Sequence, residues 1–384
     1  MKKHQKHTAL ARPALGAFGR NEWAIIGTPC GNIKKLASQI TGALSKKWKV
    51  GYVDADHVQS ATNAEADLIY TDKISFHRFD MKGQFEQFQF RPIFNSMDAV
   101  IVNGNHFKAK KQVVVIDPKK EESLSRKLDR LTDVQMILLT EGMDAPFGFL
   151  KKHIPEIDEI PVFKITDIER IVSFFHKKMS EAIPPVNGLV LVGGKSQRMG
   201  RDKGLLDYHG MPQRLYMANL LDGLCEKTYL SCRPDQMEEL AGKYPLLPDT
   251  FAGLGPMGAI LSAFREQPGA AWLVVACDLP LLDKSTLQFL LKNRNPSEMA
   301  TTFRSPVNQF PEPLVTIWEP RSYPVLLQFL AQGYSCPRKA LINSPVQILE
   351  APRADALRNV NTVEELEEVM GRLEAGGKYS NSYL

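Results

Sequence analysis

The stretch NGLVLVGGKSQRMGRDKG, residues 187–204, contains the clearest structural signal in this chain. After Asn187 and Gly188 it continues with LVLV, an unbroken apolar run typical of a buried strand. The pair Gly193 and Gly194 follows directly, and a glycine-rich turn exposes backbone N–H groups that bind phosphate oxygens. A strand that ends in such a turn predicts a nucleotide-binding α/β domain.

Basic side chains close to this turn suit a nucleoside triphosphate (NTP). The glycine pair alone would indicate little, because many tight turns use glycine for steric reasons. Arg198 and Lys203 add formal positive charge for bound phosphates and for the charge that develops when the αβ bond of an NTP breaks. The turn and its cations together predict an NTP site.

The rest of the second half alternates strand-like and helix-like segments. Strand-like runs are KTYLSCR, AAWLVVACD and EPLVTIW, and helix-like runs between them include PMGAILSAFREQ and TVEELEEVMGRLEA. This alternation predicts a three-layer α/β/α domain with a mostly parallel, Rossmann-like sheet. We assign it residues 187–384.

The first half shows the same alternation with a different residue pattern. WAIIG reads as a short strand that breaks at Gly27 before a helical stretch, and VGYVDAD, DAVIVNG, QVVVID and VQMILLT are further strands. We expect a second three-layer α/β/α domain, P-loop-like, over residues 21–180. Residues 1–20 are expected to be a basic tail, and the proline-containing residues 181–186 a linker.

Composition narrows the class of protein. With 384 residues, 43% of them hydrophobic and 24% charged, the chain fits two globular domains. A net charge of +5 indicates weak attraction to anions rather than a nucleic-acid interface. The longest apolar runs have strand length and the basic tail has no unbroken apolar stretch, so we expect no membrane span, no signal peptide and a cytoplasmic location. The five cysteines form no C-x-x-C pair, so neither a disulfide framework nor a zinc site is expected.

Two aspartates of the second half need separate consideration. Asp278 closes the run AAWLVVACD, which places a carboxylate at the C-terminal edge of a buried strand, where open α/β sheets bind ligands. Mg²⁺ prefers one or two carboxylates together with phosphate oxygens, so Asp278 is the predicted Mg²⁺ ligand. Asp249, in LLPDTFAGLGP, is equally typical of a helix cap or a turn, and the residues alone leave its role open.

These segments together resemble the molybdenum cofactor guanylyltransferases and the NTP transferases related to them. LVGGKSQRMGRDKGLL is similar to the signature L-A-G-G-x-x-x-R-M-G-x-D-K, with Val192 where alanine is usual. The similarity continues in order through PDTFAGLGPMGAI, ACDLPLL, EPLVTIW, SCPRKAL and NVNTVEEL, and it covers nearly all of residues 187–370. It implies transfer of GMP from GTP to the phosphate of molybdenum-molybdopterin, with Mg²⁺ as cofactor and pyrophosphate as second product.

The resemblance also implies a role for each matching residue. The nucleotide-binding set is Leu191, Val192, Gly193, Gly194, Lys203, Asp249 and Asp278. The catalytic set is Arg198, Lys203 and Asp278. Asn359 and Asn361, in NVNTVEEL, would hold the pterin, whereas by themselves they indicate an Asx turn before a helix capped by Thr362.

The first half contains a damaged phosphate loop. GTPCGNIKK stands between a strand and a helix, but against G-x-x-x-x-G-K-[ST] it has Asn32 for the second glycine, Ile33 for lysine and Lys34 for Ser or Thr. Efficient NTP hydrolysis is therefore not expected. The layout loosely resembles the GTP-binding adaptor of molybdopterin guanine dinucleotide synthesis, although Asn103 replaces the glutamate of its Val-Glu-Gly.

One further candidate in the first half is a metal site at the end of the strand VGYVDAD. Asp54, Asp56 and His57 are residue types that bind metals, but acids that cap a strand-to-helix turn are the commoner explanation.

Several functions remain open at this point. Base choice depends on loop geometry, so a cytidylyltransferase for the same pterin or a transferase for a sugar or cobinamide phosphate are alternatives. A pterin or nucleotide carrier is the non-enzymatic alternative, although a carrier would not need both Lys203 and Asp278. The implied partners are GTP and molybdopterin as small-molecule substrates and a molybdoenzyme or its chaperone as recipient, with no nucleic acid and no membrane.

Overall fold

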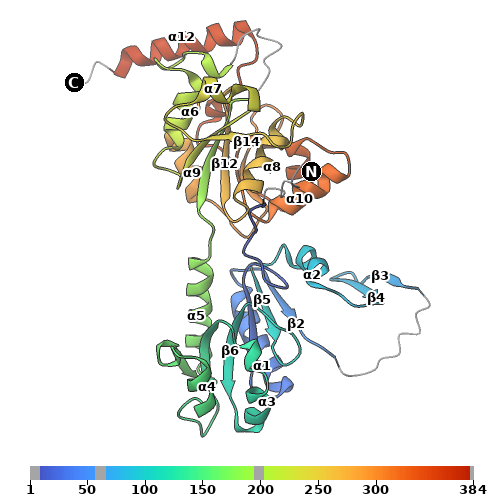
Figure 1. Ribbon diagram of the computed structural model, residues 1–384. Coiled ribbons are helices and arrows are strands. Elements are labelled where there is room, and N and C mark those ends of the chain that lie inside the picture. The colour runs from blue at the N-terminus through green and yellow to red at the C-terminus, as the bar shows by residue number, and fades with distance from the viewer. Residues whose placement is uncertain (1–8, 57–65, 194–202, 381–384) are drawn as a thin grey trace, which may run out of the picture. The chain divides into compact units, whose positions relative to one another are not determined.

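The chain divides into two compact units (Figure 1). In the computed structural model, which describes residues 9–56, 66–193 and 203–380, one unit comprises Ala14–Ala182. The other comprises Ile183–Leu384 and includes Met1–Pro13. Each contains a mostly or wholly parallel sheet with helices, so the expected α/β fold class is confirmed.

A six-stranded sheet of order β2-β5-β1-β6-β7-β8 forms the centre of the first unit, and all its pairs are parallel. Its strands are β1 (Glu22–Ile26), β2 (Val50–Val53), β5 (Ala99–Asn103), β6 (Lys111–Ile116), β7 (Val134–Leu139) and β8 (Val162–Lys164). One face packs on α1 (Cys30–Leu44) and α5 (Ile168–Glu181), the other on α3 (Glu121–Ser125) and α4 (Gly148–His153). The unit therefore has three layers.

Helix α1 explains why the damaged phosphate loop folds as it does. Ile33, Leu36, Ala37, Ile40 and Leu44 recur at helical spacing, and all five are buried. Ile33, at the position where a phosphate loop has its lysine, is 0% exposed and belongs to the core between α1 and the sheet. A side chain buried there cannot reach a phosphate.

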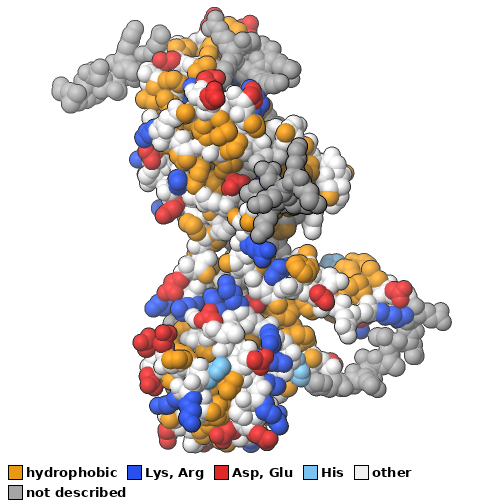
Figure 2. Space-filling model, in the orientation of Figure 1, with side chains coloured by type: hydrophobic (Ala, Val, Ile, Leu, Met, Phe, Trp, Pro, Cys, Tyr) orange, Lys and Arg blue, Asp and Glu red, His pale blue; other side chains and the backbone are white. Residues whose placement is uncertain are grey.

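A hairpin and a short helix, α2 (Gln87–Phe94), come between β2 and β5 in the sequence. Strands β3 (Leu68–Asp72) and β4 (His77–Met81) pair antiparallel and form a separate two-stranded sheet. Hydrophobic side chains gather on the hairpin surface (Figure 2), and Tyr70 and Phe79 are paired and exposed there.

The start of the first unit differs from the expected basic tail, because residues from Ala14 onward belong to the folded unit. Phe18 is 2% exposed and packs on Phe90, Phe94 and Phe107. The buried carboxylate of Glu22 accepts hydrogen bonds from the backbone N–H groups of Ala17, Phe18, Gly19 and Lys110 at 2.7–3.1 Å. The aromatic packing of Phe18 and the hydrogen bonds to Glu22 therefore hold this segment against the sheet.

Glu22→Gln is expected to destabilise the first unit by about 2 kcal/mol or more, because only one end of an amide accepts hydrogen bonds and buried N–H groups lose their partner. Scanning calorimetry of the whole chain would measure the shift in melting. Glu141→Gln, at an exposed position of the same unit, is the control and should melt like the wild type. Identical melting of both variants would show that the Glu22 contacts contribute no stability.

A seven-stranded sheet of order β11-β10-β9-β12-β14-β13-β15 forms the centre of the second unit. Its strands are β9 (Val186–Leu191), β10 (Thr228–Cys232), β11 (Leu246–Pro248), β12 (Ala271–Ala276), β13 (Ala300–Arg304), β14 (Pro311–Trp318) and β15 (Gln347–Leu349). Only β14 is antiparallel to its neighbours among these strands. The sheet is therefore mostly parallel, as the sequence predicted.

Helices cover both faces of this sheet. Leu273 and Val275 of β12 face α6 (Gln213–Leu221) and α9 (Lys284–Lys292), whereas Trp272 and Val274 face α8 (Pro256–Glu266), α10 (Ser322–Ala331) and α11 (Pro337–Ile342). A last helix, α12 (Val363–Ser380), follows. In the described parts of the chain, no helix has the length and apolar character needed to cross a membrane.

The proline-containing segment between α5 and β9 begins the second unit. Helix α5 ends at Glu181 and β9 begins at Val186. The carbonyl of Pro184 accepts from Arg294, and that of Pro185 accepts from the backbone N–H of Ala271.

Candidate active site

The carboxyl ends of neighbouring strands bring several predicted residues to one edge of the second sheet. Leu191 ends β9 and is followed by Val192 and Gly193, while Asp249 follows β11 and Asp278 follows β12 closely. Strands β11, β10, β9 and β12 are adjacent and parallel, so their carboxyl ends share this edge. Gly194 and Arg198 lie outside the described residues.

Asp249 and the start of the glycine turn lie close together. Ser231 donates its hydroxyl to Asp249 Oδ1 at 2.7 Å, and a Cβ built on Gly193 would lie 3.7 Å from Asp249 Oδ2. Burial raises the pKa of Asp249, against the lowering effects of the Ser231 hydrogen bond and the Arg233 charge. The carboxylate is thus held beside the backbone at Gly193 rather than serving as a helix cap.

Arg233 also belongs to this part of the site, although it lies in none of the sequence motifs described above. Its Nη1 donates to the carbonyl of Gly193 at 2.8 Å, and its guanidinium also pairs with Asp235. It fixes the backbone where the glycine turn begins. The one available signal is its position directly after the strand-like run KTYLSC.

Lys203, Asp278 and Asn361 converge from three distant segments. Lys203 Nζ donates to the carbonyl of Val360 and to Asn361 Oδ1, both at 2.8 Å, and lies 4.0 Å from Asp278 Oδ2. The N–H of Val360 donates to the carbonyl of Asp278 at 2.8 Å. Asn359 precedes this segment and is half-buried. Lys203, Asp278 and Asn361, which were predicted to bind phosphate, metal and pterin, therefore form one cluster.

A capping box holds Asn361 in place. Glu365 Oε2 accepts from the backbone N–H groups of Asn361 and Thr362, and the Thr362 hydroxyl accepts from the N–H of Glu365 at 3.3 Å. This is the reciprocal pattern expected of Thr-x-x-Glu before a helix. The start of α12 thus aims the Asn361 side chain at Lys203.

Asp278 is the acid of this cluster that could hold a divalent cation. Its Oδ1 is buried and has no hydrogen-bond partner in the structure. Burial raises its pKa, against the opposing charge of Lys203. Within the described ranges, no three His, Cys, Asp or Glu side chains form a metal cage. A carboxylate oxygen without a partner, close to Lys203, suits Mg²⁺, which binds few protein oxygens together with substrate phosphates.

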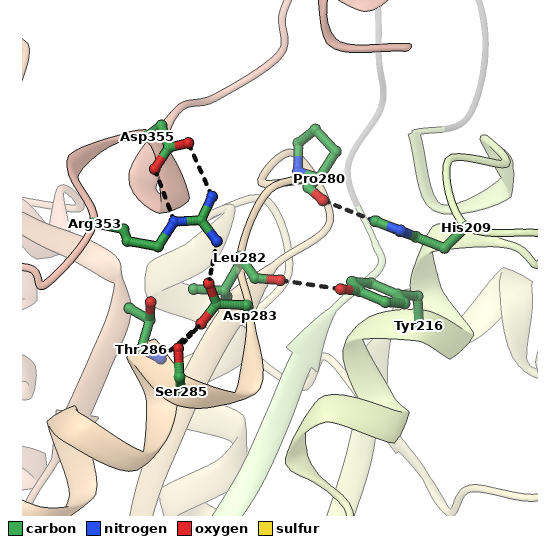
Figure 3. Close-up of polar contacts among 9 residues, drawn as sticks. All are labelled: His209, Tyr216, Pro280, Leu282, Asp283, Ser285, Thr286, Arg353 and Asp355. Atoms are coloured by element: carbon green, nitrogen blue, oxygen red, sulfur yellow. Dashed lines mark hydrogen bonds and ion pairs between the residues drawn. The ribbon is translucent and has the colours of Figure 1, made fainter. Parts of the chain in front are cut away.

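The loop that carries Asp278 is fixed from both sides (Figure 3). His209 contacts the carbonyl of Pro280 through Nε2 at 2.8 Å, and Tyr216, stacked on His209, donates to the carbonyl of Leu282. At the far end Asp283 accepts from the N–H of Thr286 and so caps α9, and it also pairs with Arg353. Asp283 is therefore a structural cap.

Asp54 in the first unit has structural partners. It accepts from the hydroxyl of Tyr52, the N–H of Ala55 and the amide of Asn103 at 2.7–2.8 Å. These hydrogen bonds lower the pKa of Asp54 against its partial burial. His57 lies outside the described residues.

Asp278→Asn is expected to leave the ligand-free protein at least as stable as the wild type at pH 7. Because burial raises the folded pKa of Asp278, its ionised form costs stability once the pH exceeds the unfolded value of about 3.9, and that cost fades as the pH falls below it. Melting temperatures between about pH 3 and pH 8 would test this. Asp222→Asn, at an exposed acid, is the control. An Asp278→Asn protein that melts well below the wild type at pH 7 would contradict the expectation.

Comparison with known proteins places the second unit in a family. The model of the MobA-like NTP transferase domain matches residues 188–347. The molybdenum cofactor guanylyltransferase of Pseudomonas putida is 34% identical over 193 residues, 50% of this chain and 100% of that protein. The molybdenum cofactor biosynthesis bifunctional protein of Synechocystis sp. is 33% identical over 186 residues, 48% of this chain. This chain covers 54% of that relative, about half its length.

A solved structure also resembles part of the chain. It is the structure of the MobB protein homolog from Bacillus stearothermophilus, which is 15% identical to this chain and has a TM-score of 0.32. The alignment covers 42% of this chain and 99% of that structure.

The second unit is a nucleotidyltransferase domain, on the match of its residues to the MobA-like NTP transferase model. The alignment with the guanylyltransferase of Pseudomonas putida covers the whole of that protein, so it identifies the family as well as the domain class. The chain belongs to the molybdenum cofactor guanylyltransferase family. The resemblance carried by the motifs from LVGGKSQRMGRDKGLL to NVNTVEEL is thereby confirmed.

Proposed function

We propose that this chain transfers GMP from GTP to the phosphate of molybdenum-molybdopterin and releases pyrophosphate. The observation that carries the proposal is the convergence of Lys203, Asp278 and Asn361 at the ligand-binding edge of a sheet in this family's domain. Such a transfer needs a lysine that binds phosphate, an acid that binds the metal ion and an amide that binds the acceptor.

The nucleotide lies in this proposal against the backbone of Leu191, Val192 and Gly193, with Asp249 beside it. The side chain of Val192 is 5% exposed and belongs to the core, which leaves its backbone for a ligand and makes the change from alanine tolerable. Arg233 keeps the carbonyl of Gly193 in place. Gly194 and Arg198 complete the proposed phosphate-binding turn.

The acceptor phosphate attacks the α-phosphorus of GTP, a new P–O bond forms, and the bond to the β-phosphate oxygen breaks with pyrophosphate as leaving group. Lys203 is held by a carbonyl and an amide oxygen, so its charge is positioned for phosphate oxygens before substrate arrives. Asp278 would hold Mg²⁺, which when bound neutralises phosphate charge. A phosphate that is already ionised needs no general base.

Asn359 and Asn361 are proposed to bind the pterin end of the acceptor. Lys203 uses Oδ1 of Asn361, so the amide N–H groups of that side chain are the donors directed to the acceptor. The capping box at the start of α12 keeps this orientation.

The wider setting completes the proposal. GTP and molybdopterin are its small-molecule substrates, a molybdoenzyme or its chaperone receives the product, and the cytoplasm is the compartment. All five cysteines are free thiols, which suits a reducing compartment. The first unit is proposed to be an adaptor-like module for the same cofactor without NTPase activity, because Ile33 is buried in its core.

GTP is expected to be the preferred donor. Pyrophosphate release from GTP, CTP, ATP and UTP, each with Mg²⁺ and molybdenum-molybdopterin, would measure the preference. Omitting the acceptor is the control for hydrolysis. Faster release from CTP would reassign the enzyme as a cytidylyltransferase, and tight nucleotide binding without release would favour a carrier.

Asp278→Asn is expected to lower the transfer rate by about 10²-fold or more, because the amide keeps the shape of the side chain but loses its attraction for Mg²⁺. The rate would be followed with a coupled pyrophosphate assay, and the melting temperature of the same sample would be recorded. Asp222→Asn is the matched control and should keep the wild-type rate. Near-normal turnover by Asp278→Asn at saturating Mg²⁺ would make Asp278 a structural residue.

A further inference from the structure

The damaged phosphate loop of the first unit carries a cysteine at the point where helix α1 begins. Cys30 is the first residue of that 15-residue helix, and it is half-buried. The first N–H groups of a helix have no partner within the helix, and the N-cap residue Pro29 supplies no side-chain hydrogen bond to them. This end of α1 therefore stabilises negative charge.

A histidine stands next to this thiol. Nε2 of His106 lies 3.2 Å from Sγ of Cys30, although 76 positions separate the two residues in the sequence. In this geometry the S–H group can pass its proton to the ring nitrogen. A nucleophile and a base within hydrogen-bond distance of each other are the typical signature of an activated nucleophile. His106 is also half-buried, so the pair is not sealed from solvent.

The turn after β5 fixes His106 against the loop after β1. Asn103 accepts from the backbone N–H of Asn105 through Oδ1 and from the backbone N–H of His106 through its carbonyl, both at 3.1 Å. Asn105 Nδ2 donates to the carbonyl of Thr28 at 2.9 Å and to the sulfur of Cys30 at 3.6 Å. The positions of Cys30 and His106 are therefore set by hydrogen bonds between two segments that are distant in the sequence.

Two cations also bind this turn. Lys127 Nζ donates to the carbonyl of Asn105 at 3.1 Å, and Arg130 Nη1 donates to the carbonyl of Gly104 at 2.9 Å. Because Asn105 contacts both Lys127 and the sulfur of Cys30, a positive charge lies close to the thiol. Nucleophilic cysteines occur in such positively charged, partly exposed surroundings.

The other four cysteines do not combine exposure with a neighbouring base. Burial raises the pKa of Cys225 to about 12 and the pKa of Cys232 to about 11, so both remain protonated at neutral pH. Cys277 is 6% exposed. Cys336 is exposed, but within the described part of the chain its sulfur has no imidazole partner. Cys336 is therefore an internal comparison for Cys30.

We propose that Cys30 and His106 form a modification site at which hydrogen peroxide oxidises the cysteine to a sulfenic acid. Oxidation of cysteine follows thiolate character and exposure, and peroxide is small enough to reach a half-buried sulfur. The thiolate attacks one peroxide oxygen, so an S–O bond forms and the O–O bond breaks. The departing hydroxide takes the proton that His106 received from the thiol and leaves as water. The cysteine loses two electrons, and the peroxide gains them.

Peroxide treatment of the whole, reduced chain in the presence of dimedone, which traps sulfenic acids, tests the proposal. Mass spectrometry of the digested protein would give the rate of labelling at each cysteine. Cys30 is expected to be labelled at least about tenfold faster than Cys336, which is more exposed but has no histidine beside it. In urea the two cysteines should react alike, because the advantage of Cys30 depends on the fold.

A histidine variant tests the pair itself. His106→Gln is expected to slow the labelling of Cys30 at least about tenfold, because the amide keeps a polar group near the sulfur but cannot carry the proton. The labelling of Cys336 in the same sample should not change. His153→Gln, at an exposed histidine of the same unit, is the control and should be labelled like the wild type.

Either of two results would overturn the proposal: equal labelling of Cys30 and Cys336 in the folded wild type, or the wild-type rate in His106→Gln. If melting shows that His106→Gln is unfolded at the assay temperature, the comparison of the two cysteines within the wild type decides. The site lies in the first unit and is independent of the proposed transfer reaction, so a chain that transfers no nucleotide can still show the expected labelling.

Discussion

The buried carboxylate of Asp278 is the constraint around which the second unit is arranged. A charge placed at the end of a buried strand is costly unless other groups compensate it. Here Lys203 approaches from the glycine turn, and the N–H of Val360 ties the segment before α12 to the same residue. His209 and Tyr216 hold the loop that follows. Parts of the chain that are far apart in sequence thus meet at one incompletely compensated acid.

The two units show how similar architectures can carry different chemistry. In the first unit the candidate metal ligand Asp54 accepts hydrogen bonds from three donors. Ile33, at the position of the phosphate-loop lysine, is packed in the core, so both residues have structural roles. In the second unit Oδ1 of Asp278 is buried without a partner. Buried polar groups are normally satisfied, so this unpartnered carboxylate oxygen supports the proposed cation site.

Much of the fold could be predicted because strands and helices leave local patterns. The apolar runs predict the central strands of both sheets. The C-terminal end of the run AAWLVVACD predicts that Asp278 lies at the edge of the sheet. The start of the first unit could not be predicted, since it depends on Phe18 meeting aromatic residues far along the chain. The antiparallel direction of β14 also leaves no mark in its own residues.

The sequence by itself determined the α/β class and the family. It also pointed to Lys203, Asp278 and Asn361 as site residues, because each of the three lies in a short motif with its own local chemistry. Only the tertiary structure decided which side chains face one another. Arg233 reaches Gly193, and the N–H of Val360 reaches the carbonyl of Asp278. Such neighbours follow from strand order and direction, which arise from packing of the whole domain and have no local signature.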